Sequence, residues 1–514
     1  MAANNTFIYT GQFRGHIPRD VIHVRIIDLS VKAIGQEAFR NCSQLRYVEL
    51  CDGLESIYKE AFRGCTSLEG ITIPSTVKEI GQEAFSGCTR SRSVELFDGL
   101  ERINKMAFNG CRSLEDITIP STVKVIDGFA FGDCEQLRNV ELPDGLESIY
   151  DGAFRGCRSL EGITIPSTVK AIGQEAFSDC SRLRYVELCD GLERINRGTF
   201  RGCTSLEDIT IPSTVKEISA LTFNGCTQLR NVELFDGLVY IDKRAFSICI
   251  SLEGITIPST VKEISEFAFS GCTRLRNVEL FDGLERINKE AFIGCTSLEG
   301  ITIPSTVKVI GQEAFRDCSQ LRNVELFDGL ERINKGAFDG CTSLEDITIP
   351  STVSYIHKIA FSNCSDLVAV EFCEEIEEFV TESSMRQWWN NGVSKLSLLT
   401  GPWLSRCNIQ RRVGMLRVQV WKLNIHAMLQ HIPTMLPFYN YNSNGNDDEY
   451  DTDGPEYDSD GSEDDPELEA KAYFASINFQ LDTYEQLQEY ISPILEPAIN
   501  CGAEGIVPLV LSFL

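Results

Sequence analysis

The sequence predicts an α/β solenoid, in which many short coils of the chain stack side by side instead of folding around one central core. Three observations predict it: a Phe recurs every 23 residues, a Cys follows each of these Phe residues by three positions, and each unit holds a short stretch of alternating polar and apolar residues. A strict period of this length is typical of repeat proteins, whose units bury their apolar faces against one another. The Phe residues that define the fifteen units are Phe39, Phe62, Phe85, Phe108, Phe131, Phe154, Phe177, Phe200, Phe223, Phe246, Phe269, Phe292, Phe315, Phe338 and Phe361.

The first part of each unit predicts a short β-strand. In the unit at 275–297, "LRNVELFDGLERINKEAFIGCTS", the segment "NVELF" alternates polar and apolar residues, which is typical of a half-buried strand. Leu275, Val278 and Leu280 follow the spacing L-x-x-V-x-L. Asp and Gly follow and suit a tight turn. Alternate units carry "PST" there, as at Pro304, and a proline favours the end of a strand because it cannot donate to a sheet ladder.

The second part of each unit predicts one short helical turn. Asn288 stands where such a turn needs an N-cap, and Asn, Ser and Asp are preferred capping residues. Each coil is therefore predicted to be a strand, a turn, a helical turn and a return through Gly-Cys. The residues at the capping position in other units are Asn104, Asn196, Asn334, Ser219, Ser265, Asp127 and Asp242.

The segment "LEGITIPSTVKEIGQEAFSGC" at 68–88 fits the pattern L-x-x-I-x-I-P-x-x-V-x-x-I-x-x-x-A-F-x-x-C throughout. This pattern resembles the BspA-like class of leucine-rich repeats, and the resemblance covers about residues 22–373. It implies a right-handed leucine-rich-repeat solenoid with a parallel β-sheet on the concave side and the short helical turns on the convex side. Members of the class are interaction proteins, including bacterial surface adhesins and large sets in unicellular eukaryotes, and are not known as enzymes.

The units alternate in two kinds, so the full period is 46 residues. Since neighbouring strands lie about 4.8 Å apart, residues 23 apart in sequence become neighbours on the surface. Two residues before the central Val or Ile of each strand, Arg and Glu alternate along the stack, and we interpret this column as self-neutralising and structural. Its members are Arg46, Glu69, Arg92, Glu115, Arg138, Glu161, Arg184, Glu207, Arg230, Glu253, Arg276, Glu299, Arg322 and Glu345.

The next column alternates Glu and Thr from Glu49 to Glu371, so no charge of its own column neutralises these carboxylates. Beside it a Phe or Pro follows each strand from Phe235 onward. If these positions face the concave side, they form an acidic row beside an apolar row, which predicts a groove for a partner protein with a basic and apolar segment. The alternative is that the Phe rings fold over the turn and the Glu side chains are only solvated. The candidate binding residues are Asn231, Glu233, Phe235, Asn277, Glu279, Phe281, Asn323, Glu325 and Phe327.

The fifteen Cys residues from Cys42 to Cys364 predict a buried structural ladder rather than a metal or redox site. Zinc sites use close pairs such as C-x-x-C, and the repeats contain none. Free Cys behaves as a small apolar residue that is often buried. Cys51, Cys189 and Cys373 instead replace the Phe or Pro of the concave row, where they can be exposed.

Composition restricts the location and the partners. The chain of 514 residues carries a formal charge of −28, and residues 441–470 hold thirteen Asp and Glu with no Lys or Arg; this argues against nucleic acid as the main partner, because phosphate binding needs clustered cations. No apolar run approaches the length of a membrane span. The N-terminus has no basic-then-apolar signal segment, and the many unpaired Cys favour a reducing compartment. A cytoplasmic location is predicted, with the nucleus and the cell surface left open.

The breaks in the period predict five segments. The region after the repeats holds all four Trp residues and apolar residues at helical spacing, which predicts a helical cap, and its arginines offer a docking site for an acidic segment. The acidic stretch predicts a disordered linker, in which Ser462 precedes "EDD" and is a candidate phosphorylation site. The predicted segments are an N-terminal cap at 1–21, the solenoid at 22–373, a helical cap at 374–440, the acidic linker at 441–466 and a C-terminal helical segment at 467–514.

These features predict a non-enzymatic scaffold that binds proteins on its concave face. The chain holds only five His, and it has no nucleophile elbow, phosphate-binding loop or dinucleotide fingerprint, so no catalytic residue, metal or cofactor is predicted. Two alternatives stay open: a surface adhesin exported without a classical signal peptide, and an enzyme of unrecognised class. The sequence does not indicate the oligomeric state.

Overall fold

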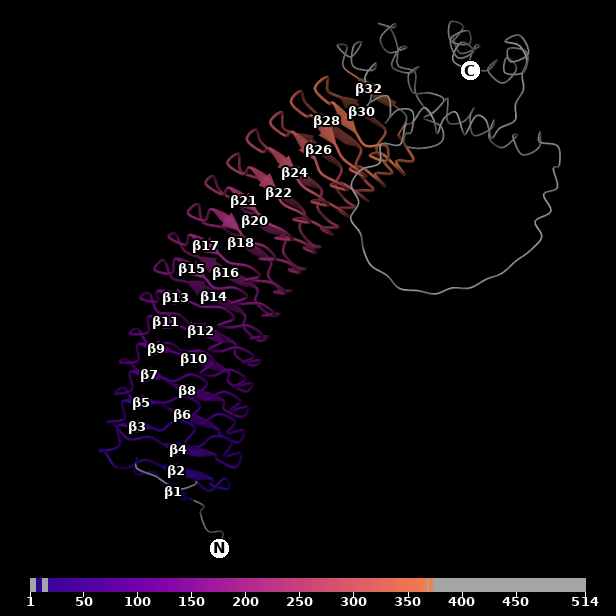
Figure 1. The fold of residues 1–514 in the computed structure, drawn as a ribbon. Helices are drawn as coiled ribbons and strands as arrows, with labels where there is room; N and C mark the ends of the chain where they lie inside the picture. The colour runs from indigo at the N-terminus through magenta and orange to yellow at the C-terminus, as the bar shows by residue number, and fades with distance from the viewer. Residues whose placement is uncertain (1–5, 12–16, 368, 373–514) are drawn as a thin grey trace, which may run out of the picture. The chain divides into compact units, whose positions relative to one another are not determined.

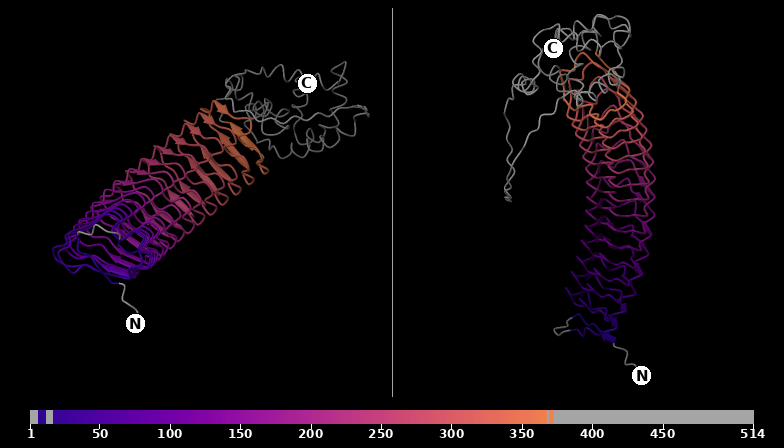
Figure 2. Two further views of the ribbon diagram at one scale, coloured as in Figure 1. Left: turned by 60° about the horizontal axis from the view of Figure 1, so that its bottom comes forward. Right: turned by 90° about the vertical axis from the view of Figure 1, so that its right-hand side faces the viewer.

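The computed structural model describes residues 6–11, 17–367 and 369–372. In this part of the chain each 23-residue unit forms one coil, and successive coils stack from β1 to β32 (Figure 1). Figure 2 shows the same stack from two other directions, with the strands of neighbouring coils side by side. All strand pairs are parallel, and the register pairs residues 23 apart, as in Ile255 with Val278. The predicted repeat architecture is therefore confirmed.

Each coil contributes a first strand of three or four residues, followed after the turn by a second strand of two residues. The segment β1 (Thr6–Ile8) adds one strand at the N-terminal end. The first strands are β2 (His23–Arg25), β4 (Tyr47–Glu49), β6 (Gly70–Thr72), β8 (Ser93–Glu95), β10 (Asp116–Thr118), β12 (Asn139–Glu141), β14 (Gly162–Ile165), β16 (Tyr185–Leu188), β18 (Asp208–Thr210), β20 (Asn231–Glu233), β22 (Gly254–Thr256), β24 (Asn277–Glu279), β26 (Gly300–Ile303), β28 (Asn323–Leu326), β30 (Asp346–Ile349) and β32 (Ala369–Phe372).

The second strands form one continuous 15-stranded parallel sheet. Each ends on an Ile that is 2% exposed or less, so the sheet covers the core with a single column of side chains. The second strands are β3 (Ala33–Ile34), β5 (Ser56–Ile57), β7 (Glu79–Ile80), β9 (Arg102–Ile103), β11 (Val125–Ile126), β13 (Ser148–Ile149), β15 (Ala171–Ile172), β17 (Arg194–Ile195), β19 (Glu217–Ile218), β21 (Tyr240–Ile241), β23 (Glu263–Ile264), β25 (Arg286–Ile287), β27 (Val309–Ile310), β29 (Arg332–Ile333) and β31 (Tyr355–Ile356).

The first strands are hydrogen-bonded in shorter groups, and the grouping follows the two kinds of unit. Toward the C-terminal end the groups are the pairs β22–β24, β26–β28 and β30–β32. Each pair joins an "ITI" strand to the "VEL" or "VEF" strand that follows it. The 46-residue period seen in the sequence is therefore also a structural unit of two coils.

The segment predicted as a helical turn forms a different structure. No helix is present in the described residues, and 289–294 is a run of turns. Glu290 and Gly294 have φ angles of 56° and 72°, and the N–H groups of Glu290, Phe292 and Gly294 each donate to a carbonyl of the next coil at 2.8 Å. A helix would bond these groups within its own segment, so here the hydrogen bonds between coils replace the helix.

Two Asn residues predicted as helix caps, Asn104 and Asn196, also connect coils, whereas Asp127 and Asp242 accept bonds from N–H groups of their own coil. The Nδ2 of Asn196 donates to the carbonyl of Ile172 in the preceding coil at 2.8 Å, and Asn104 donates to Ile80 at 3.0 Å. Asn is common at N-caps because its side chain bonds to nearby backbone. In this chain the backbone that it reaches belongs to the adjacent coil.

Aromatic and sulfur ladders fill the interior. Each Phe ring from Phe39 to Phe361 stacks on the next at a centroid distance of 5.1–5.7 Å, with ring planes 1–11° apart. Apolar residues from all coils form one continuous core. Each coil thus supplies part of its neighbour's core, as expected for a solenoid.

Candidate functional site

The predicted binding residues lie on and just after three first strands. Asn231 and Glu233 lie on β20, and the equivalent Asn and Glu residues lie on β24 and β28. All six side chains are exposed. They share one face because strand side chains two residues apart point to the same side. We call this surface, made by the outward side chains of the first strands, the first-strand face.

Thr–Glu hydrogen bonds link the coils of the first-strand face in pairs. The hydroxyl of Thr256 donates to the Oε2 of Glu279 in the next coil at 2.8 Å, and Thr302 donates to Glu325 at the same distance. The equivalent bond to Glu233 measures 3.0 Å. The sequence prediction considered only charge in this column and missed these bonds, although the 23-residue spacing already places each Thr beside a Glu.

The Thr bond orients each carboxylate without neutralising it. In the described residues, no Lys, Arg or His lies within ion-pair distance of Glu233, Glu279 or Glu325. A carboxylate has two oxygens and about four acceptor positions, so each keeps the capacity to bind a cation. The geometry therefore leaves a row of three fixed negative charges.

The N-terminal end of the same row has a different arrangement. Glu49 accepts a hydrogen bond from the Nε of Arg25 at 2.7 Å, and the Nε2 of His23 lies 2.9 Å from its other oxygen. The Arg25 hydrogen bond is the main cause that lowers the pKa of Glu49 below its usual value of 4.5. Glu49 is thus already paired with a cation of its own chain, Arg25.

The side chains two residues before each Glu of the row, on the same first strands, also differ between coils. The Nδ2 of Asn231 donates to the Oδ1 of Asp208 at 2.5 Å. Asn277 instead follows a coil with Gly254 at that position, and a methyl group on Gly254 would reach only the backbone O and the Cβ of Asn277, at 3.6 and 3.9 Å. Glycine therefore leaves space beside the Asn277 amide.

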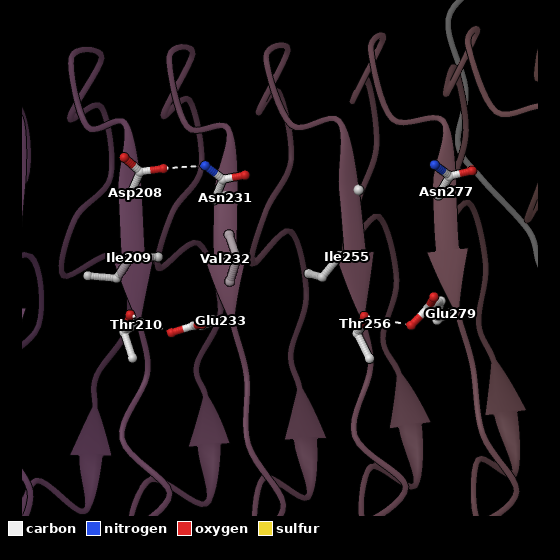
Figure 3. Close-up of a pocket in the computed structure, with 11 residues that line it drawn as sticks. Asp208, Ile209, Thr210, Asn231, Val232, Glu233, Ile255, Thr256, Asn277 and Glu279 are labelled. Atoms are coloured by element: carbon white, nitrogen blue, oxygen red, sulfur yellow. Dashed lines mark hydrogen bonds between the residues drawn. The ribbon is translucent and has the colours of Figure 1, made fainter.

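A shallow open depression of about 640 Å³ lies on this part of the first-strand face. It spans β18, β20, β22 and β24, and Figure 3 shows the Thr256–Glu279 and Asn231–Asp208 hydrogen bonds at its surface. The sequence prediction missed part of its lining, since Asp208, Thr210 and Thr256 come from the other kind of unit. We call this depression the strand-face groove. The lining residues are Asp208, Ile209, Thr210, Asn231, Val232, Glu233, Gly254, Ile255, Thr256, Asn277 and Glu279.

The predicted apolar row consists of Phe rings alone. Phe235, Phe281 and Phe327 are 44%, 47% and 48% exposed, so the rings do not fold into the core. Pro258 and Pro304, which alternate with them, are buried, and the carbonyl of each accepts a hydrogen bond from the Val N–H three residues on. Exposed rings therefore recur at every second coil.

The column of alternating Arg and Glu does not form the predicted side-chain contacts. Among the described residues, no ion pair joins members of this column, and its side chains are exposed. Backbone hydrogen bonds connect these residues instead. The N–H of Arg276, for example, donates to the carbonyl of Glu253 in the preceding coil at 2.8 Å. The long side chains stay in water, where an exposed pair gains little.

The cysteine column forms the predicted buried ladder. The thiol of each column Cys from Cys65 to Cys364 donates to the carbonyl of the Phe in the preceding coil, as in Cys295 to Phe269 at 3.2 Å. Burial raises the pKa of the Cys272 thiol to about 12, so this thiol stays protonated and unreactive. Cys51 is also buried, and Cys189 is partly exposed. In the described part of the chain, no cluster of His, Cys, Asp or Glu could hold a metal ion.

Several predictions concern residues outside the described ranges. These are the helical cap at 374–440, the acidic linker at 441–466, the C-terminal segment at 467–514, the candidate phosphorylation site Ser462, and Cys373. Within the described ranges, no helix is long and apolar enough to cross a bilayer.

Comparison with known families identifies the repeats. A family model for the BspA type leucine rich repeat region matches residues 20–128, 101–220, 193–306 and 285–385. The chain is similar to a leucine-rich repeat protein from Bacteroides ovatus, with 33% identity and a TM-score of 0.52, over 62% of this chain and 76% of that one. A leucine rich cell surface protein from Faecalibacterium prausnitzii is 26% identical, with a TM-score of 0.41, over 76% of this chain and 91% of that one. No curated protein matches the chain.

Proposed function

Because this chain belongs to the family of BspA-type leucine-rich repeats, we propose that it is a non-enzymatic scaffold that binds a partner protein on its first-strand face. Repeat solenoids commonly use one extended face for binding. The family resemblance predicts that the first-strand face is the concave one. The observation that carries the proposal is the row formed by Glu233, Glu279 and Glu325, which are exposed, held by Thr hydroxyls and unpaired with any cation of the described residues.

The chemistry of the face supports a partner segment that is both basic and apolar. Each carboxylate offers an acceptor for Lys or Arg, and an exposed Phe ring lies two residues further along the chain. Charged pairs on such a surface steer association and add specificity, while aromatic side chains contribute much of the affinity in protein interfaces. The free carboxylates and the exposed rings thus support one binding row rather than two separate sites.

The proposal includes a cytoplasmic location. It is supported by the cysteines of the described residues, all of which are free thiols, because unpaired thiols are typical of reducing compartments. Fluorescent tagging of the full chain in its native cell tests this part. Signal confined to the cell surface would overturn it.

The binding proposal is tested with the full chain as bait in a lysate of its native cells. The variant Glu233→Lys, Glu279→Lys, Glu325→Lys reverses the row. The matched control Glu193→Lys, Glu285→Lys, Glu331→Lys changes the same total charge at exposed positions beside the second strands. We expect mass spectrometry to identify a partner that is captured by the wild type and the control and lost with the row variant.

A partner captured equally by all three baits would overturn the proposal and place binding outside the first-strand face. Circular dichroism of each bait checks that the coils remain folded. Both triple variants carry only exposed substitutions, so we expect unchanged spectra.

A further inference from the structure

The alternating Arg and Glu side chains that precede the first strands have no partner of opposite charge within the described part of the chain. The column runs from Arg46 to Glu345, all of its side chains are exposed, and none of them takes part in an ion pair of the described residues. Every "VEL" coil carries Arg at this position and every "ITI" coil carries Glu, seven of each. The column is therefore neutral as a whole, in a chain whose formal charge is −28.

Side-chain size alternates in the column two residues earlier. Each Arg coil carries an exposed Gln or Arg there, and each Glu coil carries a Ser that is partly or fully buried. Long side chains thus alternate with short ones along the stack, in step with the alternation of charge. We call these two columns the entry strip. The residues of the earlier column are Gln44, Ser67, Arg90, Ser113, Gln136, Ser159, Arg182, Ser205, Gln228, Ser251, Arg274, Ser297, Gln320 and Ser343.

A surface that fits the entry strip must reverse both alternations, coil by coil. A second copy of the chain does so when a two-fold axis crosses the stack between two coils. This axis reverses the order of the coils, so every Arg coil faces a Glu coil and every long side chain faces a Ser. The spacing matches too, because the alternation of coils reads the same in both directions from such an axis. A two-fold axis parallel to the stack would instead place each coil on its own copy, with Arg against Arg.

We propose that two copies of this chain associate antiparallel through the entry strip, with the two-fold axis between the coils of Arg184 and Glu207. These coils stand at the middle of the column, so all fourteen charged positions meet an opposite charge. Arg184 of one copy faces Glu207 of the other, and Arg46 faces Glu345 at the ends. This inference goes beyond the proposed function, because the acidic row lies three residues further along the chain in the Arg coils and is not part of the strip.

Many weak contacts act together in such a pair. One exposed ion pair contributes little by itself, but every contact after the first forms within one complex and so at high effective concentration. Three of the long side chains, Arg90, Arg182 and Arg274, add cations to the coils that face glutamates. The association is electrostatic, so it weakens as salt shortens the Debye length from about 10 Å at 0.1 M to about 3 Å at 1 M.

The first test is sedimentation velocity of the full-length protein over a range of concentrations. We expect the wild type to form a dimer, with twice the monomer mass of 57.4 kDa, at low salt. We expect this dimer to dissociate at about 1 M salt. A wild type that stays monomeric at every concentration would overturn the inference.

Charge reversal at the centre of the strip tests the pairing itself. In each variant alone, like charges face each other across the axis, so we expect the dissociation constant of the dimer to rise about a hundredfold. In an equimolar mixture the two variants present opposite charges to each other, and we expect the wild-type affinity to return. The arginine variant is Arg138→Glu, Arg184→Glu, Arg230→Glu, and the glutamate variant is Glu161→Arg, Glu207→Arg, Glu253→Arg.

A control variant separates the strip from general acidity. Glu193→Lys, Glu285→Lys, Glu331→Lys changes the total charge of the chain by as much as the glutamate variant does. We expect it to dimerise like the wild type. Circular dichroism of every variant checks that the coils remain folded.

Reversal at the ends of the strip tests the orientation. The N-terminal variant is Arg46→Glu, Arg92→Glu, and the C-terminal variant is Glu299→Arg, Glu345→Arg. Each alone is expected to weaken the dimer, and their mixture is expected to restore it, because the N-terminal coils of one copy face the C-terminal coils of the other. A parallel pair displaced by one coil would place Arg46 against Glu69, and this mixture would not restore it.

Three further outcomes would overturn the inference. The first is a dimer that persists in both the arginine and the glutamate variant, and the second is a mixture of the two that does not recover the dimer. The third is loss of the dimer in the row variant Glu233→Lys, Glu279→Lys, Glu325→Lys, which leaves the entry strip intact. The lysate experiment decides the proposed function separately, since its row variant changes no residue of the strip.

Discussion

Phe292 and Phe281 belong to the same coil, yet the first is fully buried and the second is 47% exposed. Phe292 stacks between the rings of Phe269 and Phe315, at 5.1 and 5.3 Å. Phe281 has buried prolines as its neighbours in the adjoining coils. The interior column therefore repeats with every coil, whereas the surface row repeats with every second coil.

This difference separates what the repeats need for folding from what they present to other molecules. Every coil must fill the same interior space, so each Phe and Cys of the column has the same environment. The surface carries no such requirement, and the two kinds of unit place Thr, Glu, Gly and Phe there in alternation. A variant in the column should therefore act on stability, and a variant in the row should act on binding.

The largest effect is expected from Phe292→Ala. Truncation of a buried Phe leaves a cavity and typically costs about 3–5 kcal/mol, and two neighbouring rings lose a stacking partner. We expect a marked fall in the urea midpoint of the full chain and faster hydrogen exchange in the coils on either side. The matched variant Phe281→Ala should change the unfolding free energy by less than about 0.5 kcal/mol.

Similar losses from both variants would contradict the comparison, because they would mean that the exposed ring is packed as strongly as the buried one. Hydrogen exchange is the more informative measurement, since long repeat arrays need not unfold as one unit. It reports whether the damage stays near Phe292, as nearest-neighbour stacking of coils predicts.

A defect in the interior predicts a substitution that stabilises the chain instead of destabilising it. Ser91 stands where every other coil carries Leu. It is 2% exposed, and its hydroxyl oxygen has no hydrogen-bond partner within the described residues. A buried hydroxyl without a partner costs about 1–3 kcal/mol, so we expect Ser91→Leu to stabilise the chain by about this amount, measured by urea unfolding.

The reverse exchange in the next coil is the control. Leu114→Ser puts the same defect at a fully buried position of the same column. We expect the free energy of unfolding to fall by about 2–4 kcal/mol. Destabilisation by Ser91→Leu would indicate that the neighbouring coils have closed around the smaller side chain.

The interior was largely predictable from the sequence, whereas the turns and the groove were only partly so. The 23-residue spacing places Phe on Phe and Cys on Cys, because each column can be buried only by its own copies. The turn around Glu290 was mistaken for a helix, since one turn is too short for a helical period and Asn288 suits both a cap and a bond to the preceding coil.

The groove shows why surface detail was harder to predict. The exposed Phe281 and the acidic Glu279 follow from the strand pattern. The burial of Pro258 and the Thr256 bond depend on side-chain positions across two coils, which a single-unit pattern does not contain. The ion pair of Glu49 depends on Arg25, which lies in an irregular first coil.

The smallest expected effect concerns the N-terminal end of the row, where Glu49 is already paired. Its pKa in the folded chain is lowered below 4.5, first by the hydrogen bond from Arg25. A lowered carboxyl pKa means that the pairing stabilises the fold above the unfolded pKa, and that this contribution is lost as pH falls through the folded pKa.

Arg25→Ala should therefore raise the pKa of Glu49 toward its usual value, and His23→Ala should raise it less, since the Arg25 hydrogen bond is the larger cause. The measurement is a carboxyl carbon NMR titration of Glu-labelled protein, with Glu49→Gln used to assign the signal. An unchanged titration in Arg25→Ala would show that Glu49 is as free as the central carboxylates, and the two ends of the row would then be equivalent. A raised pKa would show that Arg25 of the chain itself occupies this end of the acidic row, unlike the central carboxylates, which no cation of the described residues pairs.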